Sequence, residues 1–166
     1  MKRGYGINRR LNEGVVKGLV KLAKTAKSLS FNPFKYLALK IESDVLSAFL
    51  VLRNIRGIGD KIASFILRDM VTILDIEEKI DPQYQILLQP IDRWVHGIAT
   101  YLWSDLGDRA PSWAIALKIV TKCREYGYSP VRFNQGAWMY GSTVIKETKN
   151  IPQCIKRLLH NTCHQR

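Results

Sequence analysis

The sequence predicts an all-α fold, a helical bundle formed by a single domain over residues 1–166. Apolar residues recur at intervals of three and four along most of the chain, which is the period of amphipathic helices. Proline and glycine interrupt this pattern repeatedly, and no alternating apolar–polar run is long enough to indicate a strand. Of the 166 residues 46% are hydrophobic, so the chain is long enough to bury a core.

The charge of the chain indicates a polyanionic partner. Lysine and arginine exceed aspartate and glutamate by 12, and such an excess is typical of proteins that bind DNA, RNA or an anionic membrane surface. No run approaches the roughly 18 apolar residues that span a bilayer, and the N-terminus lacks a signal-peptide pattern. Three cysteines favour reduced thiols. We therefore expect an intracellular protein of the cytoplasm or nucleoid, without a membrane partner.

The first part of the chain is predicted to form basic helices. A basic segment, residues 1–10, leads into an amphipathic helix over residues 11–29, whose apolar stripe consists of Val15, Val16, Leu19, Val20, Leu22, Ala23 and Ala26. The other side of this helix carries Lys17, Lys21, Lys24 and Lys27. Each of these lysines alone is expected to be solvated, and as a group they are expected to face phosphates.

Two further helices lead to a glycine-containing turn. Asn32 and Pro33 have the N-cap and N1 chemistry of a helix start. Either Ser43 or Asp44 can cap the next helix, which is predicted to end near Arg53.

The turn that follows is the part of the sequence most suggestive of function. Gly57 and Gly59 flank Ile58, and a helical pattern begins directly behind them. Two glycines at this spacing permit positive φ in a tight turn, and Ile58 between them is expected to point into the core. The backbone N–H groups of such a turn and of the next helix form an anion site. A plain helix–helix connection gives the same pattern, whereas a nucleotide-binding fingerprint is excluded because no strand precedes the glycines and the third glycine is absent.

The remaining elements are predicted to be helices and one acidic loop. The helix behind the turn presents Ile62, Phe65, Ile66 and Met70, and Ala63 permits close approach of a neighbouring helix. Residues 75–85 form the loop, which can contain a short helical turn. Further helices begin near Ile91, at Trp113 and at Ser129–Pro130, and a last basic helix covers residues 151–162. We expect Trp94, Trp103 and Trp113 to lie in the core.

Asp92 lies just behind Pro90 at the head of a predicted helix, where capping is its simplest role. However, the sequence I-R-G-I-G-D-K-I-A at residues 55–63, followed by P-I-D-R-W-V-H-G-I-A at residues 90–99, resembles the helix-hairpin-helix DNA glycosylase superfamily. That superfamily includes endonuclease III and the 8-oxoguanine glycosylases. Its hairpin is commonly Pro-Gly-(Val/Ile)-Gly-x-Lys-x-Ala, and its second motif is (Pro/Ala)-Val-Asp-x-x-Val. The resemblance extends over residues 5–141.

The resemblance implies a base-excision-repair DNA glycosylase with AP-lyase activity, acting on double-stranded DNA that contains a damaged base or an abasic site. Lys61 falls on the position of the nucleophile, which forms a Schiff base, and Asp92 falls on the second catalytic position. The hairpin residues Arg56, Gly57, Ile58 and Gly59 would bind the DNA backbone. Oxidised guanine is the favoured lesion.

The damaged base must leave the stack and enter a pocket. Residues 133–138 look like the pocket-lining helix of the family, with Phe133 and Trp138 expected to stack on the base and Gln135 to read its edge. Core packing is the alternative for each aromatic residue.

The chain departs from the family pattern in three ways. The acidic loop lengthens the spacing between Lys61 and Asp92, as in archaeal-type 8-oxoguanine glycosylases. The four-cysteine iron–sulfur motif of endonuclease III is missing, so no cofactor is expected. No segment resembles the family's Leu-Leu-Ser-Ala-Gln-like stretch, which lies before the hairpin.

Other functions remain open at this point. No metal is expected, because the C-terminal group Cys154, His160, Cys163 and His164 matches no common finger spacing. The main alternative is a non-catalytic helix-hairpin-helix DNA-binding protein, in which Lys61 is a surface lysine and Asp92 a cap. An RNA-binding or membrane-surface protein would explain the charge but not the motifs. The oligomeric state is left open.

Overall fold

The computed structural model describes the backbone of residues 9–163 and the side chains of residues 12–160. Within this range every regular element is helical and no strand occurs, which confirms the all-α prediction. The chain divides into two compact units, Met1–Leu87 and Leu88–Arg166, and each is described by itself. The single domain expected over residues 1–166 stays a prediction, and the basic segment before Arg9 lies outside the described residues.

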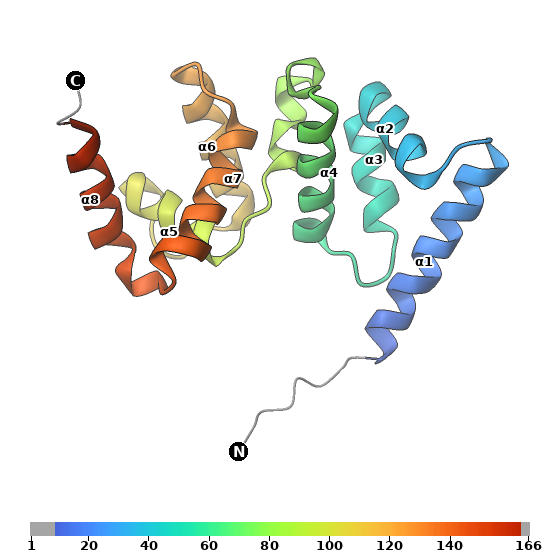
Figure 1. The fold of residues 1–166 in the computed structure, drawn as a ribbon, viewed down its shortest axis with the longest axis horizontal. Coiled ribbons are helices and arrows are strands. Elements are labelled where there is room, and N and C mark those ends of the chain that lie inside the picture. The colour runs from blue at the N-terminus through green and yellow to red at the C-terminus, as the bar shows by residue number, and fades with distance from the viewer. Residues whose placement is uncertain (1–8, 164–166) are drawn as a thin grey trace. The chain divides into compact units, whose positions relative to one another are not determined.

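Over residues 9–87, the N-terminal unit contains four α-helices (Figure 1). They are α1 (Arg9–Ser28), α2 (Pro33–Ser43), α3 (Val45–Arg53) and α4 (Asp60–Leu74). Helices α2, α3 and α4 pack against one another, and α1 packs against α2. The segment expected to be an acidic loop forms two short 3₁₀ helices, η1 (Glu77–Lys79) and η2 (Pro82–Leu88).

Side-chain caps set the starts of α2 and α3. The Asn32 side chain accepts a hydrogen bond from the backbone N–H of Lys35 at 2.7 Å, as the Asn–Pro pair predicts. Asp44 accepts from the N–H of Leu46 at 3.0 Å, so Asp44 rather than Ser43 is the cap of α3. The hydroxyl of Ser47 also donates to Asp44 at 2.5 Å, and this hydrogen bond lowers the pKa of the Asp44 carboxyl below its usual value.

The buried side of α1 differs from the predicted stripe. Val16, Leu19 and Val20 are 59%, 46% and 49% exposed. The residues that approach the rest of the unit are spaced by four, namely Gly14, Gly18, Leu22 and Ala26. The prediction is confirmed for Leu22 and Ala26 but was wrong for Val16, Leu19 and Val20, because the side that approaches the rest of the unit follows positions 14, 18, 22 and 26.

The core side of α4 is also rotated from the predicted face. Ile62 is 43% exposed, and Phe65 and Ile66 are half-buried. Met70 is buried as expected, and the other buried apolar residues of α4 are Ala63, Leu67 and Val71. The buried positions 63, 67, 70 and 71 form one helical face. Positions 63 and 67 each follow a predicted position, 62 and 66, by one residue.

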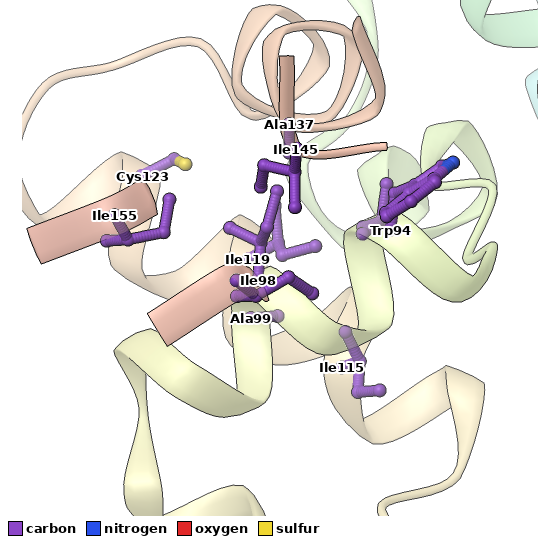
Figure 2. Packing of buried hydrophobic residues seen from close by; sticks show 11 residues of the cluster. Trp94, Ile98, Ala99, Ile115, Ile119, Cys123, Ala137, Ile145 and Ile155 are labelled. Carbon is purple, nitrogen blue, oxygen red and sulfur yellow. The ribbon is translucent and has the colours of Figure 1, made fainter. Parts of the chain in front are cut away.

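The C-terminal unit is built around α5 (Arg93–Leu102), which packs against α6 (Ser112–Glu125), α7 (Pro130–Tyr140) and α8 (Ile151–Cys163). Shorter helices connect them: η3 (Ser104–Leu106), the π-helix η4 (Gly141–Ile145) and η5 (Thr148–Asn150). Figure 2 shows the core of this unit, where Ile98 of α5 and Ile119 of α6 lie at the centre of the apolar cluster. Trp94 lies at its edge and is 5% exposed.

The tryptophans of this unit correct one prediction. Trp94 is buried and Trp103 is half-buried against the core cluster, but Trp113 is 69% exposed. The buried positions of α6 include Ile115 and Ile119. Trp113 lies in the first turn of α6, before the first of these buried positions, and its side chain is left in solvent.

Candidate functional site

The α3–α4 turn, residues 54–59, joins the two helices that the sequence places around the glycine pair. Gly57 has φ of +96°, which a residue with a Cβ rarely adopts, so glycine is required there. Ile58 is 5% exposed and its N–H donates to the carbonyl oxygen of Ile55 at 2.9 Å. The expectation that Ile58 anchors the turn in the core is therefore confirmed.

Gly59 differs from the sequence expectation. Its φ is −88° and its ψ is 176°, which is extended backbone open to any residue. A Cβ atom on Gly59 would meet no heavy atom within 4 Å. Thus neither backbone strain nor a contact within the described chain requires glycine here. Because Gly59 has no side chain, the space in front of the first residue of α4 is open.

The N-terminus of α4 has no side-chain cap. The first N–H groups of a helix have no acceptor within the helix, and together with the helix dipole they favour an anion. Helix α6 likewise lacks a side-chain cap, whereas α2, α3, α5 and α7 are capped by Asn32, Asp44, Asp92 and Ser129. The start of α4 can thus receive an anionic group from outside the chain.

Asp60 is the one acidic residue in the first turn of α4, and its charge is balanced within the turn. Arg53, the last residue of α3, forms an ion pair with Oδ1 of Asp60. The same guanidinium lies 3.5 Å from the carbonyl oxygen of Ile58. This pairing ties the end of α3 to the start of α4 and offsets the repulsion that Asp60 would exert on an incoming anion.

Lys61 is the second residue of α4 and its side chain is exposed. The candidate DNA-binding residues Arg56, Gly57, Ile58 and Gly59 lie in the turn directly before it. The structure therefore brings together an exposed amine, an uncapped helix start and an open backbone at Gly59.

Two glycines of α1, Gly14 and Gly18, are contact residues that the sequence reasoning missed. A Cβ atom on Gly14 would lie 2.9 Å from Cγ and Cδ of Arg56, and one on Gly18 would clash with Cγ2 of Ile55. The α3–α4 turn therefore lies directly on α1, with the stem of Arg56 over Gly14. The signal was present in the sequence, because two glycines inside a helix cost helix propensity and their spacing of four places them on one face.

Asp92 is the N-cap of α5, in the C-terminal unit. Its Oδ1 accepts hydrogen bonds from the N–H groups of Trp94 and Val95, both at 2.9 Å. This confirms the capping role that the sequence indicated. In the described part of the chain, Oδ2 of the half-buried carboxylate takes part in neither a hydrogen bond nor an ion pair. One oxygen thus caps the helix, and the other remains able to interact with a positive charge.

Asn134 on α7 supports the segment that carries Asp92, and sequence reasoning did not single it out. Its side chain is fully buried, and Nδ2 donates to the carbonyl oxygen of Pro90 at 3.2 Å. A buried amide with such a bond restrains the backbone two residues before Asp92. Nothing in the local sequence marks this residue, because its partner lies 44 positions away.

The three candidate pocket residues on α7 lie in different surroundings. Phe133 packs on Trp103, with ring centroids 5.5 Å apart and an angle of 34° between the planes, and it adjoins the core cluster. Gln135 is half-buried, and Trp138 is 40% exposed. Gln135 and Trp138 are three residues apart and share one side of α7. Phe133 therefore has a packing role, whereas Trp138 presents part of its ring to solvent.

A comparison with protein-family models, curated proteins and solved structures finds no match. The resemblance to the glycosylase superfamily consequently rests on the residues of the two motifs. Lys61 belongs to the N-terminal unit and Asp92 to the C-terminal unit. That both act on one sugar stays a prediction.

Among the side chains of residues 12–160, no three His, Cys, Asp or Glu side chains gather in a way that could hold a metal ion. Cys163 and His164 lie outside that range, so the C-terminal group of the sequence analysis is not described in full. Between residues 9 and 163, none of the helices combines the length and the apolar character that a membrane crossing requires.

Proposed function

We propose that this protein is a base-excision-repair DNA glycosylase with AP-lyase activity, in which the α3–α4 turn is the hairpin of a helix-hairpin-helix motif. The observation that carries the proposal is the exposed amine of Lys61 on the first turn of α4, directly behind the uncapped helix start and the open backbone at Gly59. A phosphate held by those N–H groups would place the adjoining deoxyribose within reach of this amine.

The reaction needs no group beyond the chain, DNA and water. The nitrogen lone pair of Lys61 attacks C1′ of the damaged nucleotide, and the bond from C1′ to the base breaks. The base leaves with the electron pair and takes up the proton that the attacking nitrogen loses. The sugar ring then opens to a Schiff base between Nζ and C1′. Loss of a proton from C2′ then breaks the bond from C3′ to oxygen by β-elimination, and the downstream strand leaves with a 5′ phosphate. Water hydrolyses the remaining Schiff base and frees the amine of Lys61.

Asp92 would assist this reaction through its charge. Positive charge develops on the sugar as the base leaves, and a nearby carboxylate stabilises it. Because Oδ1 already bonds two backbone N–H groups, we assign Oδ2 to this role. Asn134, through the carbonyl oxygen of Pro90, would act as a positioning residue for this carboxylate.

The flipped base would be recognised on α7. Trp138 offers a partly exposed ring for stacking, and Gln135 on the same side offers amide groups for a base edge. Oxidised guanine is the first lesion to test, and a panel of duplexes carrying different damaged bases would identify the substrate.

Borohydride trapping tests the proposal directly. Borohydride reduces a Schiff base to a stable amine, so the wild-type chain mixed with an abasic-site duplex should form a covalent protein–DNA band on a denaturing gel. Lys61→Gln should abolish the band because it removes the nucleophile. Lys79→Gln, which removes an exposed lysine at the end of η1, should leave capture unchanged.

Two outcomes would contradict this assignment. Capture that persists in Lys61→Gln would show that a different amine reacts. Absence of capture by the wild type, with DNA binding retained, would favour the non-catalytic DNA-binding protein, in which Asp92 acts only as a helix cap.

A further inference from the structure

A groove lies between α1 and the α3–α4 turn. A hollow of about 350 Å³ is lined by Glu13, Gly14, Lys17, Gly18, Lys21, Asn54 and Arg56. A second hollow of about 200 Å³ shares Gly18, Lys21 and Asn54 with it, so the two adjoin. Because Gly14 and Gly18 carry no side chain, Arg56 and Ile55 of the turn lie in close contact with α1 at one border of the groove.

The groove carries an excess of positive charge. Lys17, Lys21 and Arg56 line it together with one carboxylate, Glu13. Glu13 forms an ion pair with Lys17 at 2.6 Å on the exposed surface of α1. Within residues 12–160, neither Lys21 nor Arg56 forms an ion pair with a carboxylate. Two cations and an exposed, easily exchanged ion pair are therefore available to an anion.

We propose that this groove binds a second backbone phosphate of duplex DNA, distinct from the phosphate at the start of α4. The inference rests on the proposed function, because it assumes that DNA lies against the α3–α4 turn. Lys21 and Arg56 contact the phosphate directly, and Lys17 exchanges its partner Glu13 for it. The amide of Asn54, which also lines the groove, supplies a neutral hydrogen-bonding group.

The position of the groove favours DNA over other polyanions. Arg56 lines the groove and is also part of the turn that leads to Gly59, so one strand that passes the turn can reach both places. In Figure 1 the first half of α1 and the α3–α4 turn lie at the same end of the N-terminal unit. An anionic membrane would instead contact the exposed aliphatic residues Val16, Leu19 and Val20 of α1.

The experiment compares two pairs of lysines on the same helix. The full chain and its variants bind an undamaged duplex, and the affinity is measured by fluorescence anisotropy over a series of salt concentrations. Lys17→Gln combined with Lys21→Gln removes the two groove lysines. Lys24→Gln combined with Lys27→Gln is the matched control, because these exposed lysines of α1 line neither hollow.

Each phosphate contact that is lost should lower the slope of log affinity against log salt by about one, and lower the affinity roughly eightfold near 0.1 M salt. We expect this loss in the groove pair and a much smaller one in the control pair. Equal losses in both pairs would overturn the proposal, because the lysines would then act only through net charge. Absence of DNA binding, or a groove pair that lowers binding to anionic vesicles but not to DNA, would also overturn it.

A charge change of opposite sign gives an independent check. Glu13→Gln frees Lys17 and removes the carboxylate of the groove, so DNA binding should become tighter by a few-fold. Glu42→Gln, an exposed glutamate at the end of α2 that does not line this groove, should have less effect. A Glu13→Gln variant that binds DNA no more tightly than Glu42→Gln would contradict the proposal that the groove binds a phosphate.

Covalent capture separates this proposal from the proposed function. The groove pair should still form the borohydride adduct when the protein concentration saturates the DNA, because Lys61 is intact. Suppose that the wild type forms no adduct, but the salt dependence of its DNA affinity still depends on Lys17 and Lys21. This result would overturn the proposed enzymatic function and support the proposed phosphate site in the groove.

Discussion

A side chain in this protein can have a structural role and still keep an atom that could take part in a reaction. Asp92 shows this most clearly, because one carboxylate oxygen accepts two backbone hydrogen bonds while the other accepts none within the described residues. The sequence predicts both the cap and the catalytic role from the same aspartate. The two roles can be separated by experiment because they use different properties, namely an acceptor oxygen and a negative charge.

We predict that Asp92→Asn retains the fold but loses the reaction. Asparagine caps helices as well as aspartate does, so the melting temperature should stay close to that of the wild type. Loss of the charge should slow formation of the borohydride adduct roughly a hundredfold. Asp92→Ala should slow the adduct to a similar extent and in addition cost about 1 kcal/mol of stability. Thermal unfolding and the rate of capture measure the two effects, and an Asp92→Asn variant with normal capture would reduce Asp92 to a cap.

At the scale of elements, the close contact between α1 and the α3–α4 turn fixes the position of the turn on this helix. Ile55 and Arg56 lie on Gly18 and Gly14, so the approach of the turn depends on the absence of two side chains. Helix propensity alone would favour alanine at both positions. The glycines at these two positions therefore indicate that close packing against the turn outweighs helix propensity.

We predict that Gly18→Ala destabilises the protein although alanine is the better helix former. The new Cβ atom would clash with Ile55, and overpacking of this kind costs about 1–3 kcal/mol. Gly136→Ala in α7 is the matched control, because a Cβ atom there meets nothing within 4 Å. It should stabilise by up to about 1 kcal/mol. Thermal unfolding of the two variants measures the difference, and equal stabilisation in both would show that the turn does not lie tightly on α1.

At the scale of the whole molecule, the two units have separate sets of buried residues. Leu67 of α4 is fully buried in the N-terminal unit, and Ile119 of α6 is fully buried in the C-terminal unit. The proposed nucleophile and the proposed carboxylate are divided between these units. The net charge of +12 belongs to the chain as a whole, and we expect it to supply the salt-dependent part of the proposed affinity for DNA.

We predict that a cavity in one unit weakens that unit most. Leu67→Ala and Ile119→Ala should each lower the free energy of unfolding of their own unit by about 2–5 kcal/mol. Hydrogen exchange followed by mass spectrometry should show faster exchange in α2, α3 and α4 for the first variant, and in α5, α6 and α7 for the second. A uniform loss of protection over both units in either variant would show instead that the chain unfolds as one body.

The sequence by itself determined the all-α class, most helix boundaries and the caps at Asn32 and Asp92, because these depend on neighbours within a few residues. It also determined the anchor at Ile58 and the positions of Lys61 and Asp92 at helix starts, because turn chemistry and capping are local. Only the tertiary structure decided which side of a helix is buried. It placed Val16 and Trp113 in solvent and Gly18 in a contact, since burial depends on what another element presents to that side. For the same reason, the groove beside Arg56 and the bond from Asn134 to Pro90 required coordinates: each joins segments that are far apart in the chain.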